Sequence, residues 1–75
     1  MMAFKIAALY QFKHISDPIE LKKHYQLECE KRNIVGALII AVEGVNGTIA
    51  GSLENMDEML KIIMEDFENL EVVIH

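Results

Sequence analysis

Few side chains in this sequence could carry covalent chemistry, and the strongest candidate sits where its reactivity is low. Cys29 is the sole thiol, and Leu21 and Tyr25 precede it at intervals of four residues. This spacing places all three on one face of a predicted helix. Burial in apolar surroundings raises the pKa of a thiol and suppresses its reactivity. We therefore interpret Cys29 as a packing residue, and the sequence predicts no catalytic residue.

The histidines and carboxylates do not assemble into a predicted metal site. His14, His24 and His75 are scattered, and no two of them have the i, i+4 spacing that would place a pair of ligands on one helix face. The acidic residues between positions 54 and 68 lie opposite an apolar stripe, which is typical of a solvated helix face. We expect neither a metal nor a cofactor.

One segment, Glu43-Gly44-Val45-Asn46-Gly47-Thr48, could bind a ligand. Asn-Gly is a strong hairpin signal, and two glycines also let successive backbone amides approach an anion. Two interpretations stay open: a tight hairpin whose glycines serve the backbone alone, or a contact for a phosphate or carboxylate. The candidate binding residues are Glu43, Gly44, Asn46, Gly47 and Thr48. Glu43 has no neighbouring proton-transfer partner, which disfavours a role as general base.

Alternation and helical spacing predict the elements that position this segment. Residues 4–12 alternate as a strand, and Ser16 or Asp17 followed by Pro18 begins a helix that ends near Asn33. The continuously apolar run 34–42 favours a central or well-covered strand. Residues 48–50 return from the Asn46-Gly47 turn.

A second helix and a final strand complete the predicted order. Asn55 and Glu58 have the spacing of a reciprocal cap, and an apolar stripe with helical spacing follows. Its members are Met56, Met59, Leu60, Ile63, Met64 and Phe67. Residues 70–75 begin the last strand.

The order strand, helix, strand, strand, helix, strand predicts an α+β, ferredoxin-like βαββαβ sandwich with an antiparallel sheet. Right-handed crossovers place both helices on one sheet face and leave the other open. We expect the open face to carry Leu9 and alternate residues of the run 37–42. A partner or a second copy would have to cover such a surface.

Length and charge exclude several classes of protein. The 75 residues suffice for one small domain. A net charge of -5 leaves little basic surface, which disfavours tight nucleic-acid binding by this chain alone. No apolar run approaches the roughly 20 residues that span a bilayer. The mildly apolar N-terminus from Met1 lacks a basic n-region, so we interpret it as leading into the first strand. The expected compartment is the cytoplasm.

The sequence resembles the N-terminal domain of the rhodanese-related tRNA uridine hydroxylases. The similarity rests on Asp17-Pro18, on Leu21, Tyr25 and Cys29, and above all on the run from Gly36 to Ser52 with its Glu-Gly-Val-Asn-Gly-Thr signature. It extends from Phe4 to about Val73. The resemblance implies an acylphosphatase-like domain, with residues 1–75 as one N-terminal unit of a longer protein.

The resemblance also implies partners and an activity for the parent protein. The parent would use oxygen to hydroxylate the wobble uridine of certain tRNAs, with its essential cysteine in a C-terminal rhodanese domain absent from these 75 residues. This chain would be inactive alone and would position tRNA or support the rhodanese domain. An acylphosphatase-type hydrolase is disfavoured, because residues 13–16 lack the phosphate-cradling arginine pattern of those enzymes. The main alternative is an autonomous interaction module that forms a homodimer through the open sheet face or the last strand.

Overall fold

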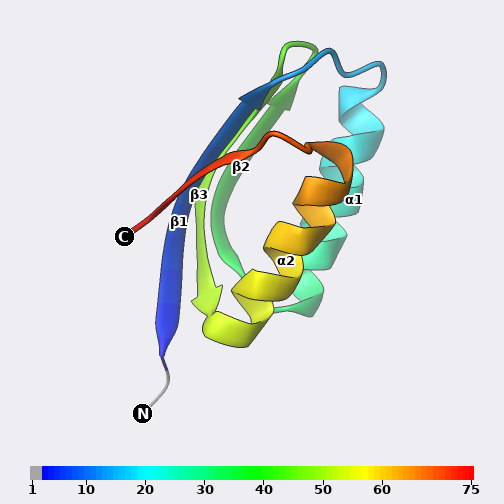
Figure 1. Ribbon diagram of the computed structural model, residues 1–75. Helices are drawn as coiled ribbons and strands as arrows, with labels where there is room; N and C mark the ends of the chain where they lie inside the picture. The colour runs from blue at the N-terminus through cyan, green and yellow to red at the C-terminus, as the bar shows by residue number, and fades with distance from the viewer. Residues whose placement is uncertain (1–2) are drawn as a thin grey trace.

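The computed structural model describes residues 3–75, so Met1 and Met2, predicted to lead into the first strand, lie outside the described residues. The elements are β1 (Phe4–Phe12), α1 (Pro18–Lys31), β2 (Val35–Ala41), β3 (Gly44–Ser52), α2 (Leu53–Asp66) and β4 (Glu71–Ile74). Figure 1 shows two layers, with the sheet on one side and both helices on the other. The predicted βαββαβ sandwich is confirmed.

Helix α1 begins and ends as the sequence predicts. Asp17 is its N-cap, and its Oδ1 accepts a hydrogen bond of 3.1 Å from the backbone N–H of Glu20. Pro18 occupies the first turn, where a missing N–H costs nothing. The helix ends at Lys31, and Asn33 has a φ of 53°, which turns the chain toward β2.

The β2–β3 turn differs from the prediction. Ala41 pairs with Gly44, so the turn is Val42-Glu43, and Asn46-Gly47 lies inside β3. The predicted Asn-Gly turn is therefore wrong, and β3 has nine residues where the sequence suggested only 48–50. Local turn preference yielded to the tertiary hydrogen bonds that hold the actual turn.

Those hydrogen bonds come from the loop between β1 and α1. The Lys13 N–H donates to the Glu43 carbonyl at 3.0 Å, and the Ile15 N–H donates to the Val42 carbonyl at 2.8 Å. A turn at Asn46-Gly47 would leave these buried or half-buried groups without their partners, which costs free energy. The loop thus fixes where the hairpin reverses.

Helix α2 starts directly after β3, and its cap also differs from the prediction. Ser52 is the N-cap, and its Oγ accepts a hydrogen bond of 3.2 Å from the Asn55 N–H. The predicted cap by Asn55 and Glu58 is wrong because both residues already lie inside the helix.

The apolar stripe of α2 supplies more buried residues to the core than any other element. Its buried members are Met56, Met59, Leu60 and Ile63, and Phe67 follows just after the helix. Met64 was predicted on this stripe but is 42% exposed, because it lies beyond the edge of the buried arc.

The sheet order is β2-β3-β1-β4, all antiparallel, so β3 and β1 are central. The prediction that β2 is central or well covered is wrong. None of its residues is buried, and Leu38 and Ile40 are only half-buried against the core. A continuous apolar run predicts a strand but does not predict whether that strand is central or at the edge of the sheet. Its place in the sheet depends on the crossover connections.

The two faces of the sheet are exchanged relative to the prediction for β1. Ala7, Leu9 and Gln11 are buried under the helices, whereas Tyr10 and Phe12 are exposed. Leu9 therefore belongs to the core and not to the open face. The register explains this, because β1 residues share a face with their partners on β3, and that strand carries buried Val45 and Ile49.

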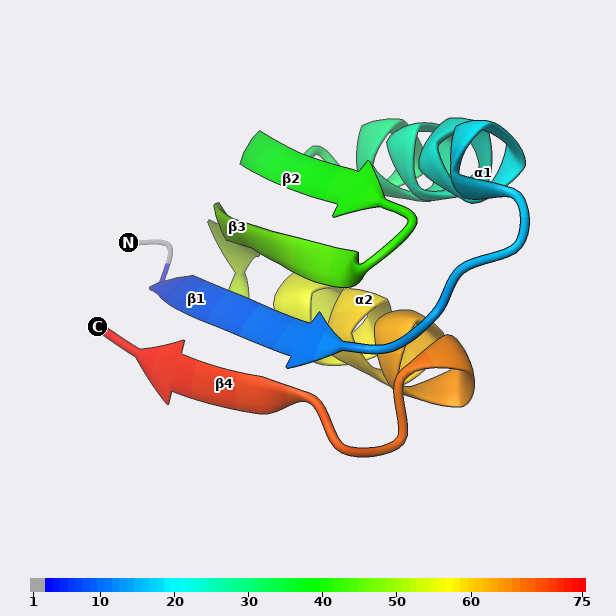
Figure 2. The same cartoon turned by 90° about the horizontal axis from the view of Figure 1, so that it is seen from above.

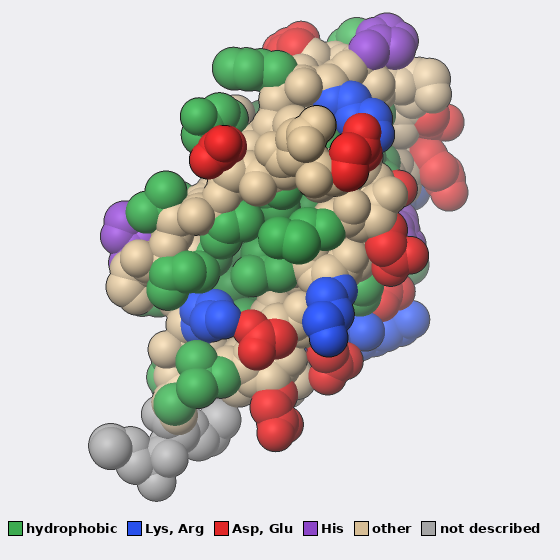
Figure 3. Space-filling view, in the orientation of Figure 1, with side chains coloured by type: hydrophobic (Ala, Val, Ile, Leu, Met, Phe, Trp, Pro, Cys, Tyr) green, Lys and Arg blue, Asp and Glu red, His purple; other side chains and the backbone are tan. Residues whose placement is uncertain are grey.

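The core is less covered at the β4 side. β4 pairs only with Ala7 to Tyr10 of β1. Figure 3 shows hydrophobic side chains gathered between the sheet and α2, bordered by charged groups. Two ion pairs connect this side of the sheet to the helix layer: Lys5 Nζ on β1 lies 2.6 Å from Asp57 Oδ1 on α2, and Lys13 Nζ, just after β1, lies 3.1 Å from Glu68 Oε2, just after α2.

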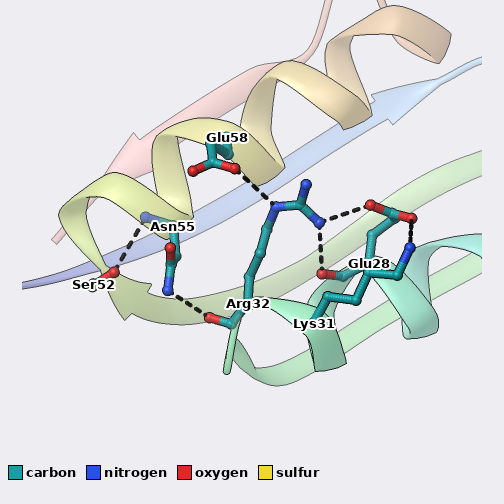
Figure 4. Close-up of polar contacts among 6 residues, drawn as sticks. All are labelled: Glu28, Lys31, Arg32, Ser52, Asn55 and Glu58. Atoms are coloured by element: carbon teal, nitrogen blue, oxygen red, sulfur yellow. Dashed lines mark hydrogen bonds and ion pairs between the residues drawn. The ribbon is translucent and has the colours of Figure 1, made fainter.

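A polar cluster joins the end of α1 to the start of α2 (Figure 4). Arg32 Nη1 donates to Glu28 Oε1 at 2.7 Å, and Arg32 Nε lies 3.5 Å from Glu58 Oε1. The Asn55 Nδ2 donates to the Arg32 carbonyl at 2.9 Å. Hydrogen bonding from Arg32 lowers the pKa of the Glu28 carboxyl. The cluster connects the two helices, whose backbones approach each other at few positions.

Candidate functional site

The sheet face away from the helices is the main unpartnered surface among residues 3–75. We call it the open face and define it by the residues that the register places there and that are exposed: Phe4, Ile6, Tyr10, Phe12, Val35, Ala37, Ile39, Asn46, Thr48, Glu71 and Val73. Phe12 is 82% exposed and Tyr10 is 49% exposed. Isolated exposed apolar residues are ordinary, but a contiguous group of this kind marks an interaction surface.

Two rows of side chains cross the middle of the open face. One row runs Ile39, Asn46, Tyr10 and Glu71 across the four strands, because Asn46 pairs with Ile39 and Tyr10, and Tyr10 pairs with Glu71. It is the polar and aromatic row.

The neighbouring row runs Ala37, Thr48, Ala8 and Val73. Its small side chains leave a shallow hollow beside Tyr10 and Phe12, which the main chain of β3 also lines. The ring centroids of Tyr10 and Phe12 lie 6.0 Å apart in an edge-to-face arrangement. The hollow suits a flat or apolar group bordered by hydrogen-bonding side chains.

The structure separates the five predicted binding residues into three groups. Asn46 and Thr48 lie together on the open face with exposed side chains. Glu43 is exposed in the turn, and Gly44 is buried where β3 begins. Gly47 pairs with Leu9 and Leu38, on the helix side of the sheet.

Both glycines of the signature serve the sheet backbone. Gly44 has a φ of 141° and Gly47 a φ of 156°. A Cβ built on Gly44 would lie 2.1 Å from the Gln11 carbonyl oxygen, and one on Gly47 would lie 2.1 Å from the Ala37 carbonyl oxygen. No side chain fits at these distances, so the neighbouring strands require glycine here.

β3 has a neighbouring strand on each side, so its backbone N–H groups are directed into the ladders. A ligand on this surface would therefore meet the Asn46 and Thr48 side chains and not a nest of amides. The loop between β1 and α1 is similarly occupied, since Lys13 and Ile15 donate their N–H groups to the turn.

Tyr10, Phe12 and Val73 are surface residues that the site prediction missed, whereas Ile39 belongs to the run 37–42, whose alternate residues were expected on the open face. The alternation of residues 4–12 already separated the large apolar set from the mixed set. The missing information was the alternation of β3, which the assumed Asn46-Gly47 turn concealed.

The remaining candidates for chemistry are packed or apart. Cys29 is half-buried against the core, and burial raises the pKa of its thiol. Within residues 3–75, no group of three or more His, Cys, Asp or Glu side chains is placed to hold a metal ion. In the same part of the chain, no helix is long and apolar enough to cross a membrane.

The fold and this surface define a class: an acylphosphatase-like α+β sandwich that presents an apolar and aromatic sheet face with Asn and Thr at its centre. Residues 4–74 match the family model described as the UPF0176 acylphosphatase like domain. The chain belongs to this family.

Relatives of known description extend the comparison. The chain is 40% identical over 61 residues to a tRNA uridine(34) hydroxylase of Acinetobacter baumannii, covering 81% of this chain and 19% of that protein. It is 34% identical over 76 residues to a tRNA uridine(34) hydroxylase of Cytophaga hutchinsonii, covering 99% of this chain and 24% of that protein. This chain therefore spans about a fifth to a quarter of the length of the curated relatives it matches.

Proposed function

We propose that this chain is the non-catalytic N-terminal domain of a cytoplasmic tRNA-modifying protein of the uridine hydroxylase type, and that its open face docks the rhodanese domain. Residues 1–75 would form one domain of a longer protein in which that second domain carries the chemistry. The family membership and the short share of each relative that the chain matches support this proposal.

The observation that carries the docking role is the exposure of Asn46 and Thr48. The glycines of the signature are explained by the sheet, but these two side chains make no hydrogen bond with another residue of the described chain. They lie at the centre of an apolar face, where a partner surface would need their hydrogen bonds to fix its orientation. A docked protein domain would accept or donate these hydrogen bonds with Asn46 and Thr48.

The charge of the open face favours a protein partner over direct contact with tRNA. The open face carries Glu71 and no lysine or arginine, and the chain as a whole has a net charge of -5. Phosphate backbones bind through cationic side chains, which this surface lacks. The tRNA would then be held mainly by the rest of the protein, with stacking on Tyr10 and Phe12 as the alternative.

A domain exchange tests the proposal. The matched segment of the Acinetobacter baumannii hydroxylase is replaced by this chain, and hydroxylation of uridine 34 is measured by mass spectrometry of tRNA from cells lacking the native protein. We expect the chimera to be active. Asn46→Ala with Thr48→Ala should lower activity about tenfold, the effect of losing about 1.4 kcal/mol of docking free energy.

Asn69→Ala is the matched control, because Asn69 is exposed in the turn before β4 and lies outside the open face. It should leave the activity unchanged. Full activity of the double variant, with unaltered thermal unfolding, would exclude the docking role. Binding of the isolated chain to tRNA, measured by fluorescence anisotropy and lost in Tyr10→Ala, would favour the stacking alternative instead.

A further inference from the structure

Strand β2 leaves an unprotected edge on the sheet. It is an outer strand of seven residues with the sequence Val-Gly-Ala-Leu-Ile-Ile-Ala, without a charge or a proline. The free N–H and C=O groups of an edge strand can pair with another chain. Edge strands therefore usually carry a charged residue or a proline, which prevents that pairing. The opposite edge, β4, has four residues and begins with Glu71, so it is both shorter and charged.

A groove of about 320 Å³ runs along this edge between α1 and β2. Consecutive residues 34–38 line it, although they alternate between the two sheet faces, so the groove follows the backbone edge. Tyr25, Cys29 and Ile49 contribute to its apolar floor. Figure 2 shows α1 on the β2 side of the molecule, while α2 lies nearer β3 and β1.

The outer wall of the groove carries one charge of each sign. Lys22, Gln26 and Glu30 line it from α1, and they follow one another at four-residue intervals along one side of the helix. Neither Lys22 nor Glu30 takes part in an ion pair among the described residues. The uncharged Gln26 lies between the two charges.

We propose that two copies of this chain associate through their β2 edges. A two-fold axis perpendicular to the sheet makes the two β2 strands antiparallel, and their free N–H and C=O groups then join the two sheets into one. Because every β2 residue is apolar or glycine, each cross-strand pair is apolar; centring on Leu38 pairs Val35 with Ala41 of the second copy.

The arrangement of charges on α1 selects a second copy over an unrelated peptide. The same two-fold axis makes the α1 helices antiparallel, which directs Lys22 toward Glu30 of the second copy and Glu30 toward its Lys22. An isologous interface requires this self-complementarity, in which residue i meets residue j and j meets i. An unrelated peptide would impose no such symmetry on the groove wall.

This association goes beyond the proposed function and uses the backbone edge of β2 and the groove beside α1, not the centre of the open face around Tyr10, Asn46 and Thr48. The open face stays accessible in the dimer, so each copy could still dock a catalytic domain there. The oligomeric state and tRNA hydroxylation are therefore measured separately, and failure of one leaves the other unaffected.

Sedimentation equilibrium of the full 75-residue chain with charge-reversed variants tests the dimer. We expect a concentration-dependent dimer for the unmodified chain. Lys22→Glu and Glu30→Lys should each raise the dissociation constant about tenfold, because each places like charges opposite one another. Mixing the two variants should restore association as a heterodimer, since opposite charges then face each other at both positions.

Lys23→Glu is the matched control, because Lys23 is an exposed neighbour on α1 that does not line the groove. It should leave the dissociation constant unchanged. Glu30→Lys makes the acidic chain less negative, so weaker association of that variant cannot come from general repulsion. Circular dichroism verifies that each variant is folded.

Three outcomes would overturn the proposal. One is a monomer at high micromolar concentration. The second is equal weakening by Lys23→Glu and Lys22→Glu. The third is a dimer that is insensitive to Lys22→Glu but lost in Tyr10→Ser, which would place the contact on the open face.

Discussion

At the residue scale, the Tyr25 side chain joins helix α1 to helix α2. It is buried on α1, and its hydroxyl donates a hydrogen bond of 2.6 Å to Asp66 Oδ2 at the end of α2. Burial, together with that hydrogen bond, raises the pKa of the Tyr25 hydroxyl well above its ordinary value of 10.0. The sequence placed Tyr25 on the buried face of α1 but could not supply its partner, which is 41 residues away.

The raised pKa of Tyr25 predicts a loss of stability in alkali. Below the ordinary pKa, the phenol is protonated in both states and its full contribution is present. As the pH rises above that value, the unfolded chain ionises first, so the free energy of unfolding falls. Tyr25→Phe should cost about 1.5–3 kcal/mol at neutral pH through loss of the hydrogen bond to a carboxylate, and should flatten the alkaline decline.

Urea unfolding from neutral pH to about pH 11 measures both effects, across the range in which tyrosine ionises. Tyr10→Phe is the control, because Tyr10 lies on the open face and its hydroxyl makes no hydrogen bond with another residue of the described chain. An identical alkaline decline in Tyr25→Phe and the unmodified chain would contradict the role of this hydroxyl.

At the scale of elements, the boundaries depend on which side chain captures the free backbone groups. Asp17 was one of the two residues predicted to cap α1, and it is the cap. The cap of α2 is Ser52, three residues before the predicted Asn55. Serine and asparagine are both common N-cap residues. Ser52 is the cap because β3 ends at Ser52 and α2 begins at the next residue, Leu53.

Ser52→Ala should therefore lower the free energy of unfolding by about 1 kcal/mol, the usual value of an N-cap hydroxyl. Ser16→Ala is the matched control, because Ser16 is exposed before α1 while Asp17 provides that cap. Thermal unfolding followed by circular dichroism compares the two variants. An equal effect of both would show that the Ser52 hydroxyl does not cap α2.

At the scale of the whole molecule, register decides which side of the sheet becomes the core. On β1 the apolar bulk of Phe4, Ile6, Tyr10 and Phe12 favours burial, yet this set faces outward. Pairing with β3 transfers the alternation of that strand to β1, and the polar Asn46 and Thr48 must face away from the helices. The other β1 set, with Ala7, Leu9 and Gln11, is buried although it includes a polar residue. Gln11 is satisfied there because its Oε1 accepts a hydrogen bond of 2.9 Å from the Asn69 N–H.

This assignment predicts opposite results for two truncations on β1. Leu9→Ala removes a side chain that is 3% exposed and should destabilise the fold by about 2–5 kcal/mol. Phe12→Ala removes a larger side chain that is 82% exposed and should change stability by less than about 0.5 kcal/mol. Urea unfolding of both variants measures the difference, and a larger loss for Phe12→Ala would reverse the assigned faces.

The sequence by itself determined the order of elements, the start of α1, the stripe of α2 and the family signature, because helical spacing, alternation and caps are local properties. Only the tertiary structure decided the position of the β2–β3 turn, the place of β2 at the sheet edge and the face on which Leu9 lies. Each of these depends on hydrogen bonds between distant segments, such as Lys13 with Glu43, and on a register that carries the pattern of β3 to its neighbours. The same register brought Asn46 and Thr48 beside Tyr10, so the candidate surface exists only once the strands are paired.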